Sequence, residues 1–111
     1  MAILTKGSDN VKKDDTTVFV DKIEQHKNIC SEIHTTYIKK NNDYGDAFSK
    51  TYQDLGIISA ITRISDKYNR LRSLVLSNKP IMVNDESIID TLLDMANYCI
   101  MTVMELQDED E

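Results

Sequence analysis

The chain has 111 residues, a formal net charge of −6 and a sequence pI of about 4.8. This length supports one domain at most, and small domains bury a limited share of their surface, so we expect self-association into a dimer or larger homo-oligomer. The acidic balance argues against a nucleic-acid partner. The sequence also contains no stretch of eighteen apolar residues, the length that a membrane-spanning helix needs.

Two features of the sequence predict a cytoplasmic location. The apolar run at the amino terminus is too short for a signal peptide. The cysteines, Cys30 and Cys99, both fall within helical apolar patterns and form no CxxC motif, so reduced core cysteines are the favoured interpretation. We therefore expect a soluble protein in a reducing compartment.

The amino-terminal part of the chain predicts a flexible arm followed by a helix. Residues 1–16 are polar and show no hydrophobic period, whereas Thr16 or Thr17 can cap a helix from Val18 to about Lys40. The apolar stripe of that helix follows four–three spacing: Phe19, Ile23, His26, Cys30, Ile33 and Tyr37. We expect the helix to end at residues 41–43, followed by a turn at Tyr44 and Gly45.

Two further helices are predicted in the middle of the chain. The first is short, from Asp46 to Leu55, with Phe48 and Tyr52 facing inward and Gly56 ending it. The second runs from Ile57 to about Ser77 and carries a stripe of Ile57, Ile61, Ile64, Tyr68, Leu71 and Val75. Residues 77–80 include the only proline and break this helix, and residues 81–83 form a short extended link.

The last predicted helix, Asp85 to Leu106, combines apolar rows with a row of acids. One apolar row is Ile88, Leu92, Met95 and Cys99, and the other is Ile89, Leu93, Ala96, Ile100 and Met104. Between them lies what we call the acidic row: Glu86, Asp90, Asp94 and Asn97. Their spacing stacks these side chains on one face, where the acids repel one another unless a cation lies beside them. A helix apolar on most of its circumference is expected to be buried on most of it.

The preceding long helix carries a complementary set of side chains, which we call the basic row: Arg63, Asp66, Lys67 and Arg70. A short connection predicts antiparallel packing of the two helices, with the rows in contact. One interpretation is a salt-bridge network that fixes the register of the helices. The other is a site in which the acidic side chains hold a divalent metal ion, with magnesium as the candidate cofactor. The arginine and lysine side chains of the basic row would hold phosphate.

These elements predict an all-α fold, a helical bundle of three long helices and one short helix. Residues 1–16 would be the flexible arm, residues 17–107 a single all-α domain and residues 108–111 an acidic tail. Three segments of this domain resemble a phage and bacterial family, nucleotide modification associated domain type one, over about residues 40–106. They are YGDAF at 44–48, RISDK with RL at 63–67 and 70–71, and DESIIDTLLDMANY at 85–98.

The acidic last helix is also similar, more distantly, to that of the MazG-like all-α nucleoside triphosphate pyrophosphohydrolases. That resemblance implies an oligomer of helical hairpins, magnesium held by an E-x-x-E pair and an E-x-x-D pair, and cleavage between the α and β phosphates. This chain offers Asp66 alone in place of the first pair, and acids spaced four apart in place of the second. It therefore has fewer metal ligands and more positive charge than the MazG-like pattern.

Each candidate site residue receives a role on this basis. The metal ligands would be Asp66, Glu86, Asp90 and Asp94, of which Asp66, Asp90 and Asp94 are also the catalytic candidates. The substrate-binding candidates are Tyr44, Phe48, Arg63, Lys67, Arg70 and Asn97. The arginines and the lysine suit phosphate, whereas Tyr44 and Phe48 either stack on a base or belong to the core. Asn97 either donates to the ligand or bonds to a neighbouring helix.

Three functions follow from these roles. The first is magnesium-dependent hydrolysis of a nucleoside triphosphate or related nucleotide, as in a pyrophosphohydrolase. The second is a non-catalytic phage protein that binds and sequesters a nucleotide immune signal as an anti-defence sponge, in which case the location is the host cytoplasm. The third is a purely structural helical oligomer. The sequence leaves open the base, the phosphate number and whether the nucleotide is hydrolysed or only bound.

Overall fold

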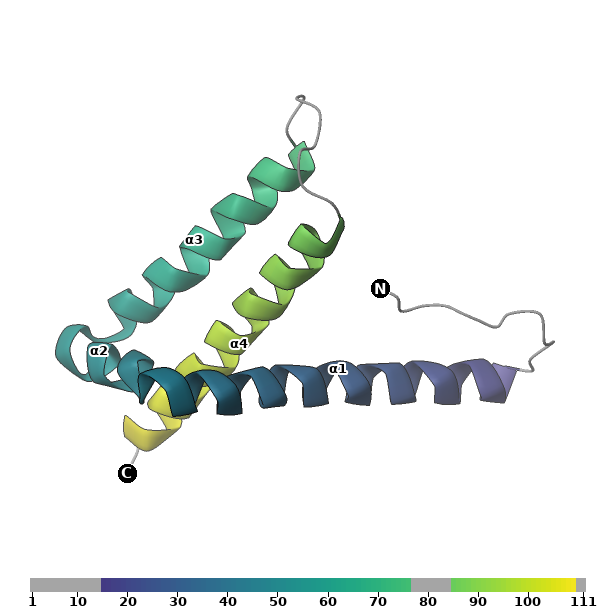
Figure 1. The fold of residues 1–111 in the computed structure, drawn as a ribbon, viewed down its shortest axis with the longest axis horizontal. Helices are drawn as coiled ribbons and strands as arrows, with labels where there is room; N and C mark the ends of the chain where they lie inside the picture. The colour runs from purple at the N-terminus through teal and green to yellow at the C-terminus, as the bar shows by residue number, and fades with distance from the viewer. Residues whose placement is uncertain (1–14, 77–84, 110–111) are drawn as a thin grey trace.

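The computed structural model describes residues 15–76 and 85–109, and these residues are helical except at short breaks (Figure 1). The elements are α1 (Asp15–Tyr44), α2 (Ala47–Leu55), α3 (Ile57–Leu76) and α4 (Asp85–Glu109). The described part of the chain contains no strand. The prediction of an all-α fold with three long helices and one short helix is confirmed.

Helix α1 is longer than the sequence predicts at both ends. It begins at Asp15 rather than Val18, and it continues through residues 41–43 to Tyr44, so the prediction that these polar residues end it is wrong. Asparagine is only a weak helix breaker, and the conformation that ends the helix comes one residue later, at Gly45, with φ +69°. Asn41 consequently lies on the helix, facing the neighbouring elements.

The short helix α2 is bounded by two glycines, as the sequence indicates for its end. Gly56 has φ +75° and donates its backbone N–H to the carbonyl of Tyr52 at 2.6 Å. A positive φ is a conformation that only glycine adopts at little cost, so this position turns the chain sharply from α2 into α3. Phe48 is half-buried and Tyr52 is 4% exposed, which confirms that both face inward.

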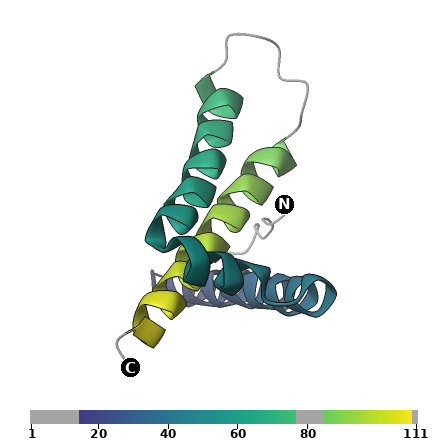
Figure 2. The ribbon, with the colours of Figure 1, turned by 90° about the vertical axis from the view of Figure 1, so that its left-hand side faces the viewer.

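Helices α3 and α4 run antiparallel and side by side in both views (Figures 1 and 2). Their packing is close because small side chains lie in the hairpin: Ala60 is fully buried, and Thr91 and Thr102 are nearly so. Each threonine hydroxyl donates to the carbonyl four residues earlier in α4, to Ser87 at 2.6 Å and to Tyr98 at 2.7 Å. The buried hydroxyls are thus satisfied without a partner on α3.

Helix α1 crosses the hairpin with its carboxyl-terminal third and extends away from it with the rest (Figure 1). Residues 21–32 are exposed throughout, including Ile23 and Ile29, whereas Ile33 and Tyr37 are half-buried where α1 meets α4. Among the side chains that the structure describes, the expected stripe is therefore covered only where Ile33 and Tyr37 meet α4. Residues 1–14 of the predicted flexible arm at 1–16 lie outside the described residues, as do the predicted helix break at 77–80 and the predicted link at 81–83. Residues 15 and 16 of that arm belong to α1.

The core within the described residues is small. Tyr52 and Ala60 are its buried hydrophobic residues. The Tyr52 hydroxyl is buried and completes no hydrogen bond. The nearby Glu109 carboxylate raises the pKa of this hydroxyl, and burial raises it further. The apolar rows of α4, expected to be buried, are half exposed at Leu92 and Ile100. One copy of the chain does not cover them.

The close approach of α3 to α4 makes a prediction about Ala60. Ala60→Leu adds volume at a fully buried position, and overpacking should lower the free energy of unfolding by about 1–3 kcal/mol. Chemical denaturation followed by circular dichroism measures the change. Ile58→Leu, on the same helix but 69% exposed, is the matched control and should leave the unfolding midpoint unchanged. Equal midpoints for both variants would show that this contact is loose.

Candidate functional site

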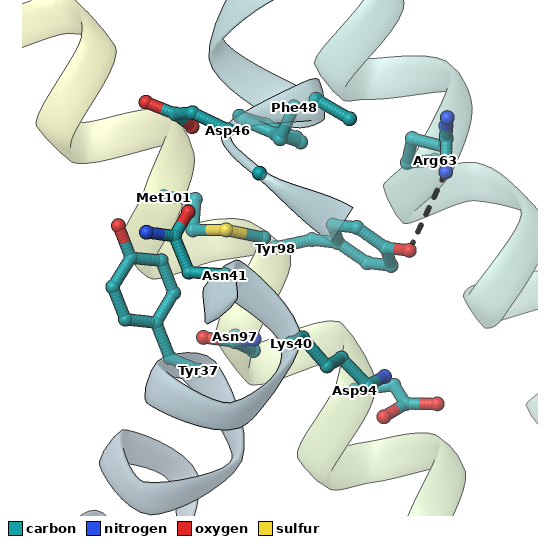
Figure 3. Close-up of a pocket in the computed structure, with 12 residues that line it drawn as sticks. Tyr37, Lys40, Asn41, Asp46, Phe48, Arg63, Asp94, Asn97, Tyr98 and Met101 are labelled. Carbon is teal, nitrogen blue, oxygen red and sulfur yellow. Dashed lines mark hydrogen bonds between the residues drawn. The ribbon is translucent and has the colours of Figure 1, made fainter. Parts of the chain in front are cut away.

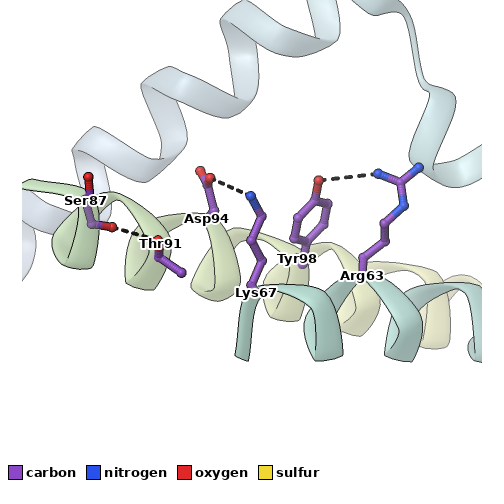
Figure 4. Close-up of polar contacts among 6 residues, drawn as sticks. All are labelled: Arg63, Lys67, Ser87, Thr91, Asp94 and Tyr98. Atoms are coloured by element: carbon purple, nitrogen blue, oxygen red, sulfur yellow. Dashed lines mark hydrogen bonds and ion pairs between the residues drawn. The ribbon is translucent and has the colours of Figure 1, made fainter. Parts of the chain in front are cut away.

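The two rows of charged residues meet at one ion pair. Lys67 Nζ lies 3.1 Å from Asp94 Oδ2, and one turn along, Arg63 Nη1 donates to Tyr98 Oη at 3.5 Å (Figure 4). The prediction that the rows face each other across an antiparallel hairpin is confirmed at this pair. These contacts mark the register of the antiparallel pair: four residues back along α3, from Lys67 to Arg63, correspond to four residues forward along α4, from Asp94 to Tyr98. The same register places Arg70 level with Thr91.

A cavity of about 230 Å³ opens where all four helices come together, and Figure 3 shows its lining. Helix α1 contributes Tyr37, Lys40 and Asn41, the α1–α2 turn and α2 contribute Gly45, Asp46, Ala47 and Phe48, and α3 contributes Arg63. Helix α4 contributes Asp94, Asn97, Tyr98 and Met101. The chain thus brings aromatic, cationic, amide and carboxylate groups together from segments that are distant in the sequence.

The aromatic side of this cavity is a stacked pair. The ring centroids of Phe48 and Tyr98 are 5.9 Å apart, and the rings are inclined by 28°. The guanidinium of Arg63 lies 6.0 Å from the centre of the Tyr98 ring, within the range of a cation–π contact. A flat aromatic surface with a cation at its edge offers stacking to a planar ring and a charge to an attached anion.

A second cavity, of about 280 Å³, adjoins the first because Asp94 and Asn97 line both. It is lined on α1 by Glu32, Ile33 and Thr36, and on α4 by Asp90, Leu93, Asp94 and Asn97. Three carboxylates, those of Glu32, Asp90 and Asp94, therefore border one space. Joined, the two cavities reach the size range of small-molecule sites, roughly 300–1,000 Å³.

The structure brings some of the sequence-predicted residues together and leaves others apart. Phe48, Arg63, Asp94 and Asn97 line the first cavity, and Asp90 lines the second. Lys67 reaches the site through its bond to Asp94. Asp66 and Arg70 are exposed on α3 and line neither cavity. The side chains of Tyr44 and Glu86 lie outside the described part of the chain.

Sequence reasoning missed the contribution of α1 and of Tyr98. The sequence pattern predicts Tyr37 as part of an apolar stripe and Lys40 as a helix end, and it indicates no role for Glu32. The reason is that the crossing of α1 over α4 leaves no local pattern in the sequence. Tyr98 follows Asn97 directly on the acidic helix, so its position beside the predicted row was the available signal.

A metal site requires several ligand side chains that converge on one point. Among them, no three histidine, cysteine or acidic side chains are gathered closely enough to hold a metal ion. Asp94 is in addition paired with Lys67. Magnesium usually binds to one or two carboxylates together with substrate phosphates and water rather than to an all-protein cage. The described residues therefore offer no metal site built from protein ligands alone.

Comparison with known proteins gives one match. The family model described as nucleotide modification associated domain 1 matches residues 40–106, more than half of the chain, and the chain belongs to this family. The match includes the α1–α2 turn, α2, α3 and most of α4, and therefore most of the residues that line the first cavity. No curated protein and no solved structure matches the chain. None of the helices in the described ranges is long and apolar enough to cross a membrane.

The contribution of the Lys67–Asp94 ion pair to the free energy of unfolding shows whether the charged rows stabilise the fold. Side chains of Lys67 and Asp94 are 28% and 35% exposed, so solvent screens their attraction. A double-mutant cycle with Lys67→Met and Asp94→Asn should give a coupling energy below about 1 kcal/mol. Urea unfolding of the four proteins measures it. A coupling of several kcal/mol would instead support the interpretation of the rows as a structural brace.

Proposed function

We propose that this protein binds a nucleotide in the two adjoining cavities. The observation that carries the proposal is the stacked pair of Phe48 and Tyr98 with the Arg63 guanidinium at its edge. Bases stack on aromatic rings, and a guanidinium forms paired, charge-assisted bonds to phosphate oxygens. The family description, which refers to nucleotide modification, supports the same ligand class.

The proposed orientation places the base in the first cavity, against the aromatic pair. Asn41 and Asn97 also line this cavity, and an amide carries both a donor and an acceptor for the edge of a base. The phosphates would lie toward Arg63 and Lys40, with Lys67 beside them. Arg70, level with Thr91, would meet the far end of a longer phosphate chain. A net charge of −6 makes local cations necessary, since the protein as a whole repels an anionic ligand.

Magnesium-dependent hydrolysis of a nucleoside triphosphate or related nucleotide is the activity we propose first. Its support is the second cavity, whose carboxylates adjoin the cationic groups. Asp90 and Asp94 would hold magnesium together with the phosphates of the ligand. Bound there, the ion would neutralise charge that develops on the phosphoanhydride. Glu32, which lines the same cavity from α1, would then accept a proton from an attacking water. This proposal includes an evolutionary relationship to the MazG-like pyrophosphohydrolases.

Sequestration without hydrolysis is the second proposal, and the ion pair favours it. Lys67 neutralises Asp94, which removes one carboxylate from metal binding while keeping a cation next to the phosphate position. With fewer carboxylates free to bind a metal, the site would bind a nucleotide and leave it intact. A phage protein that retains a host immune nucleotide would have this character.

One experiment separates the two proposals. The purified protein is incubated with a panel of nucleotides, with magnesium or with a chelator, and the mixture is analysed by mass spectrometry. Hydrolysis predicts new nucleotide products in the magnesium sample alone. Sequestration predicts intact nucleotide recovered from the denatured protein in both samples. If no nucleotide of the panel yields a new product, and none is recovered from the protein, the result contradicts nucleotide binding.

The phosphate role of Arg63 gives a direct prediction for affinity. Arg63→Met should weaken nucleotide binding about 10- to 100-fold, because the loss of a charged hydrogen bond is worth about 1.5–3 kcal/mol. Arg63→Lys should recover only part of the loss, since lysine keeps the charge without the fork. Calorimetric titration measures both.

The matched control is Arg72→Met, an exposed arginine on the same helix that lines neither cavity. It should bind nucleotide as the wild type does. Equal losses in Arg63→Met and Arg72→Met would mean that general charge, and not this cavity, determines binding. The Arg70→Lys variant, in the same titration, tests whether a second arginine reaches the ligand.

A further inference from the structure

A histidine and a cysteine are in contact on the part of α1 that extends away from the hairpin (Figure 1). Cys30 Sγ lies 3.8 Å from His26 Nδ1, and both side chains are exposed. The sequence predicts that Cys30 is a reduced cysteine in a core, and the structure shows that the core part of this prediction is wrong. The thiol and the imidazole therefore meet in solvent, where a dissolved ion can reach both.

Helical geometry brings these two side chains together. Residues four apart in an α-helix lie on the same face, about 6 Å apart along the axis, so that one side chain lies above the other. Helix α1 contains no glycine and no proline between Asp15 and Tyr44, and its backbone keeps this spacing throughout. The sulfur and the nitrogen are therefore held near each other by one helix, without support from another element.

The distance between the two donor atoms matches the one that a tetrahedral metal ion requires. Zinc binds thiolate sulfur at about 2.3 Å and imidazole nitrogen at about 2.0–2.1 Å. At the tetrahedral angle, bonds of these lengths place the sulfur and the nitrogen about 3.6 Å apart. The observed distance is 3.8 Å, so an ion can bind to both atoms with little movement of either side chain. A weak hydrogen bond from the thiol is what the ion would replace.

Charge and ligand type determine which ions suit this pair. A net charge of −6 attracts cations to the protein as a whole. Lys27, three residues before Cys30, is exposed, so water and salt screen its repulsion of a cation. Thiolate and imidazole are preferred by zinc and similar ions, whereas magnesium prefers oxygen ligands. The pair therefore suits a different class of ion from the carboxylates of the second cavity.

We propose that His26 and Cys30 chelate a divalent ion of the zinc class, with water in the remaining coordination positions. In the described ranges no three histidine, cysteine or acidic side chains converge, so the protein supplies two of the four tetrahedral ligands. The thiol proton passes to solvent as the sulfur–metal bond forms. The ion joins successive turns of a helix that is exposed there, and uncovered helix is marginal in water. Neither residue lines a cavity, so this inference is independent of the nucleotide site.

The test is a titration of the full chain with zinc, followed by competition with a chelating dye, in a phosphine reductant that supplies no competing sulfur. The wild type should bind one ion per chain. His26→Ala and Cys30→Ser should each weaken zinc binding at least tenfold, because a single protein ligand remains. Cobalt in place of zinc should give a thiolate-to-metal absorption band that Cys30→Ser removes. Since both positions are exposed, circular dichroism without metal should show unchanged helix content in both variants.

Two matched controls should bind zinc as the wild type does. His34→Ala removes an exposed histidine one turn beyond Cys30, and Cys99→Ser removes an exposed thiol on α4, a helix without histidine. The proposal is overturned if the wild type binds no zinc, if its cobalt form lacks the thiolate band, or if either control loses as much affinity as Cys30→Ser. A ratio of one ion to two chains also overturns it, because a second copy would then supply the remaining ligands.

Discussion

The packing of α3 against α4 is the contact on which the rest of the structure depends. Ala60 and the threonines of α4 allow the two backbones to approach, and that approach determines where every other group lies. It brings the charged rows together at Lys67 and Asp94. Helices α1 and α2 then cover part of this side of the hairpin and close the first cavity. The hairpin is thus the element on which the groups of the candidate site are assembled.

The chemistry of the site depends on a competition among a few charges. Lys67 is bonded to Asp94. Under the proposed function, a phosphate beside Lys67 would compete with Asp94 for the same ammonium group, and the carboxylate released in this way would be able to bind a cation. Nucleotide and magnesium would then strengthen each other's binding, because each removes an unfavourable charge left by the other. Retention of the pair in the complex would keep the site free of metal.

The sequence predicts the helices better than it predicts the contacts between them. Periodicity located all four helices, and the glycine at 56 ended α2 where expected. The facing of Lys67 and Asp94 followed from the short connection between two amphipathic helices. The crossing of α1 over α4 did not, because nothing local in a stripe such as Ile33 and Tyr37 indicates which helix it will contact. That crossing supplies Tyr37, Lys40 and Asn41, so three of the twelve residues that line the first cavity could not be assigned to it from the sequence.

The threonines of α4 have a consequence for how the hairpin can move. Their hydroxyls bond within their own helix, so among the described residues the hydrogen bonds that join α3 to α4 are those of Arg63 to Tyr98 and of Lys67 to Asp94. The rest of the contact is side-chain packing around Ala60 and the threonines, which itself favours one register of the two helices. A ligand that drew Arg63 and Lys67 away from α4 would remove both polar links together. The hairpin would then be held in register by packing alone.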